Sequence, residues 1–386
     1  MPLDATRAIL ADLIGFPTVS ADGNLELIAY AQSRLDAIGG STQMTVSPCG
    51  RKANLFATIG PDAPGGVVLS GHTDVVPAEG QDWASDPFEA VEAEGRIHGR
   101  GACDMKGFLA CARAMAARCA DAPLARPLHL AFTYDEEVGC LGAPVLLDAI
   151  REAGVRPAAC IVGEPTEMRV VEGHKGMCEY TTRLHGLAGH GSDPGAGVSA
   201  VEYALRYGAR LLALREALRA RTPPGSRFDP PETTLQIGRL AGGSSHNVIA
   251  EQAELDWELR PVVPEDRDFV LAEMARFADE ELLPEMRAVH PGAAIETETV
   301  GDVTGLAPMP DSEAVRLAAA LTGGNETALV AFGTEAGLFQ AAGIPTVACG
   351  PGSIHQAHKA DEYVELAQLR LCLGMIERLI PRLAEA

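Results

Sequence analysis

The chain has 386 residues, of which 47% are hydrophobic, and its 31 basic and 53 acidic side chains give a formal charge of -22. This length exceeds what one ordinary hydrophobic core holds and predicts two domains. The acidic balance argues against nucleic acid or an anionic membrane surface as a partner, because both are bound by basic faces.

The cysteines and the N-terminal stretch indicate where the protein works. Nine cysteines form no Cys-x-x-Cys pair and are odd in number, which is typical of small buried residues in a reducing compartment. Residues 1–14 include acidic side chains and no long apolar run, so we expect neither a signal peptide nor a membrane span there. The expected location is the cytoplasm.

The first half of the chain alternates between helical and strand patterns. Apolar spacing predicts helices at 4–14, 25–38 and 105–119, and short apolar runs predict strands at 54–60, 67–70, 96–101, 128–134 and 160–166. Such alternation predicts an α/β domain whose site lies beyond the carboxyl edge of its sheet.

The pattern changes after Gly173. The next segments read as a strand, a helix, two strands, a helix and a strand, at 179–186, 200–218, 233–240, 253–259, 266–280 and 294–300. This βαββαβ order predicts a ferredoxin-like unit inserted into the chain. The α/β pattern then resumes with a helix, two strands and a helix at 312–321, 328–332, 344–349 and 363–383. We therefore expect an α/β catalytic domain, with a mixed central sheet flanked by helices, over 1–177 and 304–386, interrupted by the smaller domain at 178–303.

A histidine and an aspartate follow the apolar strand at 67–70. The two-residue period of a strand lets His72 and Asp74 leave it on one side. A carboxylate can hold an imidazole in the tautomer that leaves its other nitrogen free for a metal. By itself the pair equally fits satisfied core or surface residues. Asp104 follows at a loop-to-helix junction, where its alternative role is that of an N-cap.

Carboxylates also follow two later strands. Asp135, Glu136 and Glu137 come directly after the strand at 128–134, and Glu164 ends the strand at 160–166. Like charges so close raise one another's pKa unless cations offset them, although a solvated turn is the plainer interpretation of the run. With His72, Asp104 and a late histidine, Glu136, Glu137 and Glu164 would suit two divalent ions joined by a bridging carboxylate and a water. Nitrogen and oxygen ligands without a thiolate favour zinc, with cobalt or manganese as alternatives.

The chain resembles the dinuclear zinc aminoacylase and carboxypeptidase family, which includes acetylornithine deacetylase, succinyl-diaminopimelate desuccinylase and glutamate carboxypeptidases. The resemblance covers nearly the whole chain and rests on segments in the family's order: SGHTDVVP, GRGACDMKG, TYDEEVG, GEPT and the terminal GPGS with a following His. It implies the two-domain fold above, with the smaller domain as a lid through which the enzymes form homodimers.

The resemblance also implies residue roles in the larger domain. His72 and Glu164 would complete the ligands of one metal ion and Glu137 with a late histidine those of the other, while Asp104 bridges, Asp74 orients His72 and Glu136 serves as general base and later acid. The late ligand is expected to be His358, in His-Lys-Ala-Asp-Glu-Tyr. His355 is the alternative.

Three residues of the lid match the family as well. His190, in Gly-Leu-Ala-Gly-His, would reach the partner subunit's active site and stabilise the oxyanion, and its plainer role is that of a turn residue. Asn247 and Arg260 resemble substrate contacts. The planar fork of an arginine can bond both oxygens of an α-carboxylate. The alternative for Arg260 is a surface ion pair with one of the acids nearby.

The segment Gly333-Thr334-Glu335-Ala336-Gly337 guides the choice of substrate. It resembles acetylornithine deacetylases, whereas desuccinylases tend to show Gly-Thr-Ser-Asp-Gly. The carboxylate of Glu335 is able to pair with the terminal ammonium of ornithine, and equally able to support a metal ligand. The expected reaction is removal of the acetyl group from N2-acetyl-L-ornithine, a small N-acyl amino acid, to give ornithine and acetate for arginine biosynthesis. The alternatives are succinyl-diaminopimelate desuccinylation, a broader N-acyl-amino-acid amidohydrolase or dipeptidase activity, and a non-catalytic relative, although every expected ligand position is filled.

Overall fold

The computed structural model describes residues 2–385, which divide into two compact units. The first unit runs up to Gly173 and resumes at Pro308–Leu329 and from Thr334 onward. The second unit comprises His174–Ala307 and Val330–Gly333. Within the described residues, no helix combines the length and the apolar character needed to cross a membrane.

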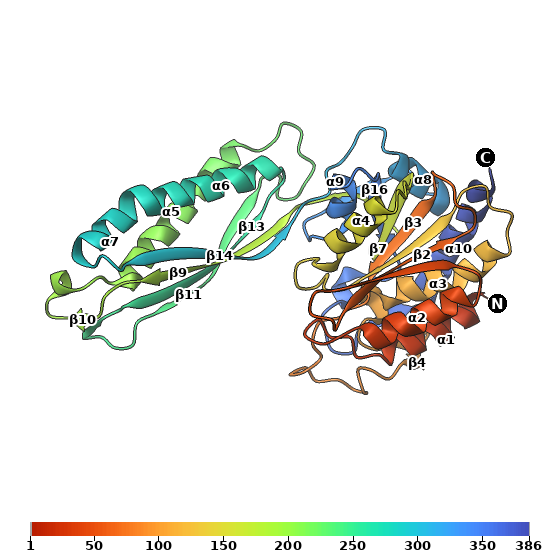
Figure 1. Ribbon diagram of the computed structural model, residues 1–386, viewed down its shortest axis with the longest axis horizontal. Coiled ribbons are helices and arrows are strands. Elements are labelled where there is room, and N and C mark those ends of the chain that lie inside the picture. The colour runs from red at the N-terminus through yellow and green to blue at the C-terminus, as the bar shows by residue number, and fades with distance from the viewer. Residues whose placement is uncertain (1, 386) are drawn as a thin grey trace. The chain divides into compact units, whose positions relative to one another are not determined.

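A mixed sheet lies at the centre of the first unit (Figure 1). Its strands, in spatial order, are β1 (Ser41–Val46), β2 (Ala53–Ile59), β6 (Leu128–Thr133), β3 (Val67–His72), β7 (Ala159–Pro165), β16 (Thr346–Gly350), β8 (Val170–His174) and β15 (Thr327–Val330). Strand β3 is buried throughout and runs parallel to both β6 and β7. Its continuous apolar run is what a parallel strand covered on both faces requires. The carboxyl ends of these three strands therefore share one edge of the sheet.

Two groups of helices cover this sheet. One group shares a single apolar core with the strands and consists of α1 (Pro2–Ile14), α2 (Leu25–Asp36), α3 (Gly107–Ala120), α8 (Glu313–Thr322) and α10 (Leu366–Ala384). The other group, α4 (Gly142–Glu152) and α9 (Ala336–Ala341), contacts the sheet separately. Helix α3 packs so closely that a Cβ atom at Gly163 would lie 1.9 Å from the ring of Phe108. Glycine is therefore required immediately before Glu164.

A small sheet corrects the prediction for the end of the chain. The helix expected from Tyr363 begins only at Leu366, because Tyr363–Glu365 forms strand β17. This strand pairs antiparallel with β5 (Arg96–His98), which also pairs with β4 (Val91–Ala93). The pairing places the segment around Glu362 beside the glycine-rich turn that precedes Asp104.

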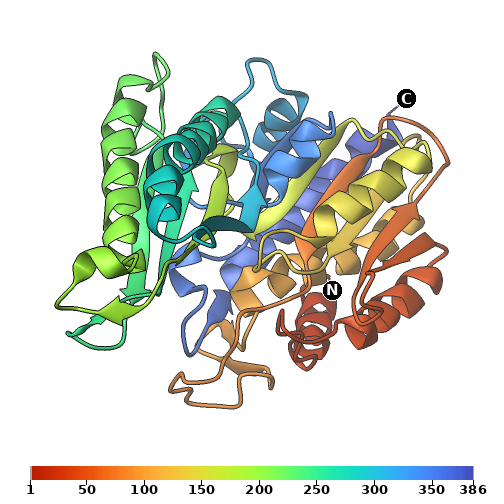
Figure 2. The same cartoon turned by 60° about the vertical axis from the view of Figure 1, so that its left-hand side comes forward.

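The second unit contains a four-stranded antiparallel sheet in the spatial order β11-β13-β9-β14. In chain order its elements are β9 (Met177–His185), β10 (Gly189–His190), α5 (Ala200–Ala220), β11 (Thr234–Gly242), β12 (Val248–Ile249), β13 (Gln252–Arg260), α6 (Pro264–Phe277), α7 (Leu283–Val289) and β14 (Ala294–Val303). Helices α5 and α6 lie side by side (Figure 2). Trp257 stacks on Tyr180 with ring centroids 4.4 Å apart, and both belong to a core that includes Leu211 and Met274 from the two helices.

Candidate metal centre

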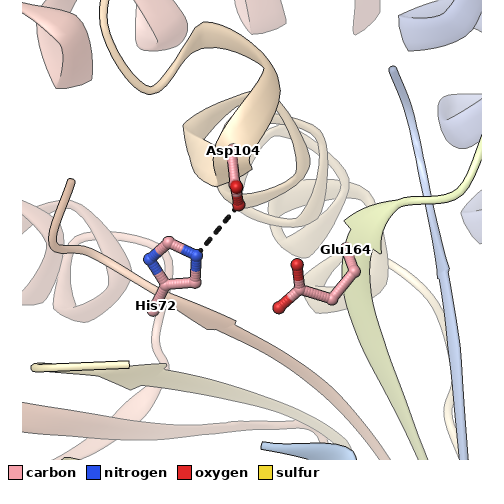
Figure 3. A group of neighbouring side chains, drawn as sticks. All are labelled: His72, Asp104 and Glu164. Atoms are coloured by element: carbon pink, nitrogen blue, oxygen red, sulfur yellow. Dashed lines mark hydrogen bonds and ion pairs between the residues drawn. The ribbon is translucent and has the colours of Figure 1, made fainter. Parts of the chain in front are cut away.

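Three potential ligands converge at the carboxyl edge of the large sheet (Figure 3). His72 ends β3, Glu164 lies in the last residues of β7, and Asp104 lies in the short turn 102–106 before α3. His72 Nε2 is 3.1 Å from Asp104 Oδ1, and the ligand atoms of all three residues lie within 4.8 Å of one another. These distances allow the three side chains to hold one metal ion.

A second group of potential ligands shares Asp104 with the first. His358 Nε2 lies 3.5 Å from Asp104 Oδ2 and 3.1 Å from Glu137 Oε2. The two oxygens of Asp104 therefore face different histidines, as a carboxylate that bridges two ions would. His355 belongs to neither group and is exposed in the single turn Ile354–Gln356.

Asp104 does not cap the helix that follows it. The N-cap position of α3 is Lys106, and no side chain makes a capping hydrogen bond there. The backbone dihedrals of Asp104 are non-helical, and its side chain is directed at the two histidines instead. This removes the N-cap as the reason for an aspartate at this position.

Asp74 contacts the centre in a different way from the one we predicted. The ring of His72 is held by the backbone, because its Nδ1–H donates to the carbonyl oxygen of Asp74 at 2.8 Å, whereas the carboxylate lies 3.7 Å away. This leaves Nε2 free to face Asp104. The carboxylate of Asp74 accepts the hydroxyl of Ser20 at 2.7 Å and the backbone N–H groups of Glu136 and Glu137 at 3.1 and 3.3 Å. The side chain therefore fixes the turn that carries both glutamates.

The carboxylates at this centre repel one another and require nearby cations. Burial raises the pKa of Glu164, Glu136 and Glu137, and the neighbouring carboxylates raise each of them further. Burial alone would also raise the pKa of Asp104, but its hydrogen bonds to His358 and His72 outweigh burial and hold it below the usual range. Divalent cations would offset this repulsion.

One buried oxygen at the centre lacks a partner. Glu164 is buried, and its Oε1 atom has no hydrogen-bond partner among the described residues. A buried carboxylate oxygen without a partner is costly, so such an atom calls for a ligand. Together with two imidazoles and three carboxylates in the two groups, this oxygen fits a site for divalent ions.

Glu136 and Glu335 occupy different environments near these ligands. Glu136 is half-buried and lies between the strand end and Glu137. Glu335 is only 1% exposed, and its two oxygens accept the hydroxyls of Ser70 at 2.6 Å and Thr133 at 2.8 Å. A carboxylate closed off in this way is not presented to a substrate in this structure. Its contacts favour the alternative role, which is to support the strand that carries His72.

The remaining predicted residues lie in the second unit. His190 is exposed, and its Nδ1 accepts the backbone N–H of Ser192 at 3.2 Å. Asn247 Oδ1 accepts the hydroxyl of Ser245 at 2.9 Å. Arg260 pairs with Glu258 at 3.1 Å, which is the surface ion pair named above as its alternative role. The structure shows no further function for these three residues.

Sequence reasoning missed several residues that support the centre. Arg100 and Glu362 form a buried ion pair beside Asp104, and Lys52 pairs with Asp135 at 2.6 Å next to the two glutamates. Arg100, Asp135 and Glu362 stand inside the segments that indicated the site. Their charge next to predicted ligands was the only available signal, since nothing local tells a buried ion pair from a solvated one.

Comparisons with known proteins agree with this geometry. Residues 68–382 match the sequence profile of peptidase family M20/M25/M40. An acetylornithine deacetylase from Myxococcus xanthus is 37% identical over 388 residues, covering 98% of this chain and 97% of that protein. Two solved structures share the fold: an M20 family metallo-carboxypeptidase from Sulfolobus solfataricus, with 17% identity and a TM-score of 0.75, and the aminopeptidase PepT from Bacillus cereus, with 19% identity and a TM-score of 0.74. Each alignment covers 99% of both chains. The chain therefore belongs to peptidase family M20/M25/M40 and is a hydrolase that acts on amide bonds.

Proposed function

We propose that this protein removes the acetyl group from N2-acetyl-L-ornithine, using two divalent metal ions, with Zn²⁺ as the first choice and Co²⁺ as the alternative. The observation that carries hydrolysis is the pair of ligand groups that share Asp104, with Glu136 beside them. The relative from Myxococcus xanthus supports acetylornithine as the substrate. The segment Thr334-Glu335-Ala336 also favours it over a succinylated substrate.

The ligand groups divide between the two ions. His72 and Glu164 would hold one ion, Glu137 and His358 the other, and Asp104 would contribute one oxygen to each. Bound ions would polarise the amide carbonyl and lower the pKa of a water between them.

Glu136 is the proposed general base. Its carboxyl adjoins Glu137 and interacts with the charges of His72 and Asp104, which places it beside the water that it would deprotonate. It removes a proton from the attacking water, whose oxygen forms a bond to the acetyl carbon. When the carbon–nitrogen bond breaks, Glu136 returns the proton to the departing amine, leaving acetate and ornithine. The carboxylate of Asp74 holds the backbone of this base in place by accepting the N–H of Glu136.

His190 of the partner subunit is the proposed donor to the oxyanion. In this chain Nδ1 of His190 faces Ser192, whose Oγ lies 2.7 Å and whose backbone nitrogen lies 3.2 Å away, so Nε2 is the ring nitrogen available to a substrate. An Nε2–H group is the donor that a developing negative oxygen needs. We accordingly infer a homodimer formed through the second unit, which sedimentation analysis would test.

The nine free cysteines, eight of them buried, support a reducing compartment such as the cytoplasm.

The experiment combines metal analysis with a base variant and a substrate panel. Protein purified without chelator should carry two divalent ions per chain, and Glu136→Gln should keep both while kcat falls by about 10²- to 10⁴-fold. Among acetylornithine, acetylcitrulline, succinyl-diaminopimelate, acetylmethionine and dipeptides, acetylornithine should give the highest kcat/KM. Absence of bound metal, or a near-normal kcat in Glu136→Gln, would refute the mechanism. A higher kcat/KM for another substrate would replace acetylornithine with that compound.

A further inference from the structure

A buried ion pair lies next to the candidate metal centre without belonging to it. The side chains of Arg100 and Glu362 are each 1% exposed, and Arg100 Nη1 is 2.8 Å from Glu362 Oε2. Taking two charges out of water is unfavourable unless the geometry is good and their remaining hydrogen-bonding atoms are satisfied. Within the described residues Nε of Arg100 has no hydrogen-bond partner. The other polar atoms of the pair do have partners, and these show what the pair does.

Glu362 holds the backbone from which Asp104 projects. Its Oε1 accepts the N–H groups of Cys103 at 2.8 Å and Asp104 at 3.0 Å. Its Oε2 accepts the N–H of Gly101 at 3.0 Å, in addition to Arg100. Three N–H groups of one turn therefore converge on one carboxylate, and the position of the shared ligand Asp104 depends on it.

Arg100 holds the segment that carries His358. It donates to the carbonyl oxygen of Lys359 at 3.2 Å and to Gln81 Oε1 at 2.5 Å. Gln81 in turn donates from Nε2 to the carbonyl oxygen of His358 at 2.9 Å. The backbone of His358 has a φ of 63°, a region that L-residues rarely adopt, so these bonds secure a conformation that the residue would not choose alone.

We propose that Arg100 and Glu362 form a positioning pair that sets the separation of Asp104 and His358 and thereby determines the affinity of the second metal site. This inference rests on the proposed dinuclear function. The second site consists of Asp104, Glu137 and His358, and two of these three ligands are held by the pair.

The first metal site depends on the pair through one ligand only. His72 ends a buried strand and its ring is fixed by the carbonyl oxygen of Asp74, while Glu164 lies in strand β7. His358, by contrast, is 53% exposed and has a loop on both sides. Loss of the pair should therefore weaken the second site more than the first.

The test measures metal binding rather than turnover. Full-length, metal-free protein is titrated with Co²⁺, and binding is followed by calorimetry and by the visible absorption of the ion. The wild type should bind two ions per chain. Glu362→Gln and Arg100→Lys should keep the first site within a few-fold, while the Kd of the second rises by about 10- to 100-fold, the usual effect of losing a partner that supports a ligand. Lysine cannot replace the planar fork that reaches several acceptors at once.

A matched control and a milder variant keep the test decisive. Glu365→Gln removes a carboxylate from the neighbouring exposed pair with Arg96, at 3.6 Å, and should leave both sites unchanged. Gln81→Ala removes the link to the carbonyl of His358 and one acceptor of Arg100, but it leaves the ion pair of Arg100 and Glu362 in place. It should therefore weaken the second site even if a substitution in the buried pair prevents folding.

Selective loss of the second site in these variants supports the inference. Unchanged binding of both ions, or an equal loss at both sites, overturns it, because the pair would then have no specific effect on the second site. Fewer than two ions in the wild type itself would refute the proposed dinuclear function. That failure is visible before any variant is made.

Discussion

Replacing Glu335 by glutamine tests whether this residue selects the substrate or supports the metal centre. Its carboxylate accepts hydroxyls from Ser70 and Thr133. Ser70 precedes His72 by two residues on β3, and Thr133 is paired with His72 across β3 and β6. Glu335 therefore fastens the beginning of α9 to the two strands that place His72 and the glutamates of the centre.

The size of the effect follows from these two hydrogen bonds. Glutamine has one acceptor oxygen and one donor group, so one of the two hydroxyls loses its acceptor. A hydrogen bond to a charged group contributes about 1.5–3 kcal/mol. Burial disfavours the charged form of Glu335, as its raised pKa indicates, so removing the charge returns part of this loss. We expect the free energy of unfolding to fall by about 1–2 kcal/mol.

The kinetic consequence distinguishes the two roles. Support of His72 affects every substrate, so kcat/KM should fall by the same factor for acetylornithine and acetylmethionine. If Glu335 instead paired directly with the ornithine ammonium, losing that ion pair would cost about 2–5 kcal/mol for acetylornithine alone. The ratio of the kcat/KM values for acetylornithine and acetylmethionine would then change by about 30-fold or more.

Kinetics with both substrates and urea unfolding of Glu335→Gln provide the assay. Thr133→Val serves as the control, because it removes one hydroxyl and leaves the bond from Ser70 in place. A shift in the ratio of kcat/KM values of about 30-fold or more in Glu335→Gln would refute our reasoning and make Glu335 the substrate contact that the sequence first suggested.

Three further predictions concern charge and metal. Burial lowers the pKa of His129 to about 4, so the unfolded state binds the extra proton as the pH falls below about 6.5. From pH 7 to pH 5 the wild type should lose about 2 kcal/mol of unfolding free energy that His129→Phe does not lose, as urea titrations at both pH values would show. Treatment with a chelator should abolish hydrolysis, and added Zn²⁺ or Co²⁺ should restore it, which initial rates would establish. Asp74→Asn should lower kcat by about 10-fold or more while metal analysis still finds at least one ion per chain, because its carboxylate holds the turn of Glu136 and Glu137 rather than the ring of His72.

The strands of the large sheet could be predicted where burial makes them continuously apolar. Strand β3 is buried along its whole length, and the polar residue that ends it stands out for that reason. Strand β1 (Ser41–Val46) could not be found this way, because it lies at the sheet edge with mostly exposed or half-exposed residues and no apolar alternation. Strand β17 was not predicted for another reason, because its residues also continue the helical pattern of α10.

The contacts that support the metal ligands could not be predicted from the sequence. They join distant parts of the chain through groups that no sequence pattern marks. The pair of Arg100 and Glu362 spans 262 positions, and no local pattern relates the two residues. Glu362 also binds backbone N–H groups, which every residue except proline possesses. Such contacts follow from the fold, and the sequence specifies them only through it.

Asp74 shows how one residue can join the metal ligands to the base. The motif His-x-Asp suggested a contact between the two side chains, yet the backbone carbonyl of Asp74 holds the ring of His72. The carboxylate is thereby released to bind the N–H groups of Glu136 and Glu137, with Ser20 completing its hydrogen bonds. A single residue thus couples the direction of one ligand to the position of the proposed base. An aspartate suits this place because its short side chain accepts several donors while its own carbonyl remains available to the ring.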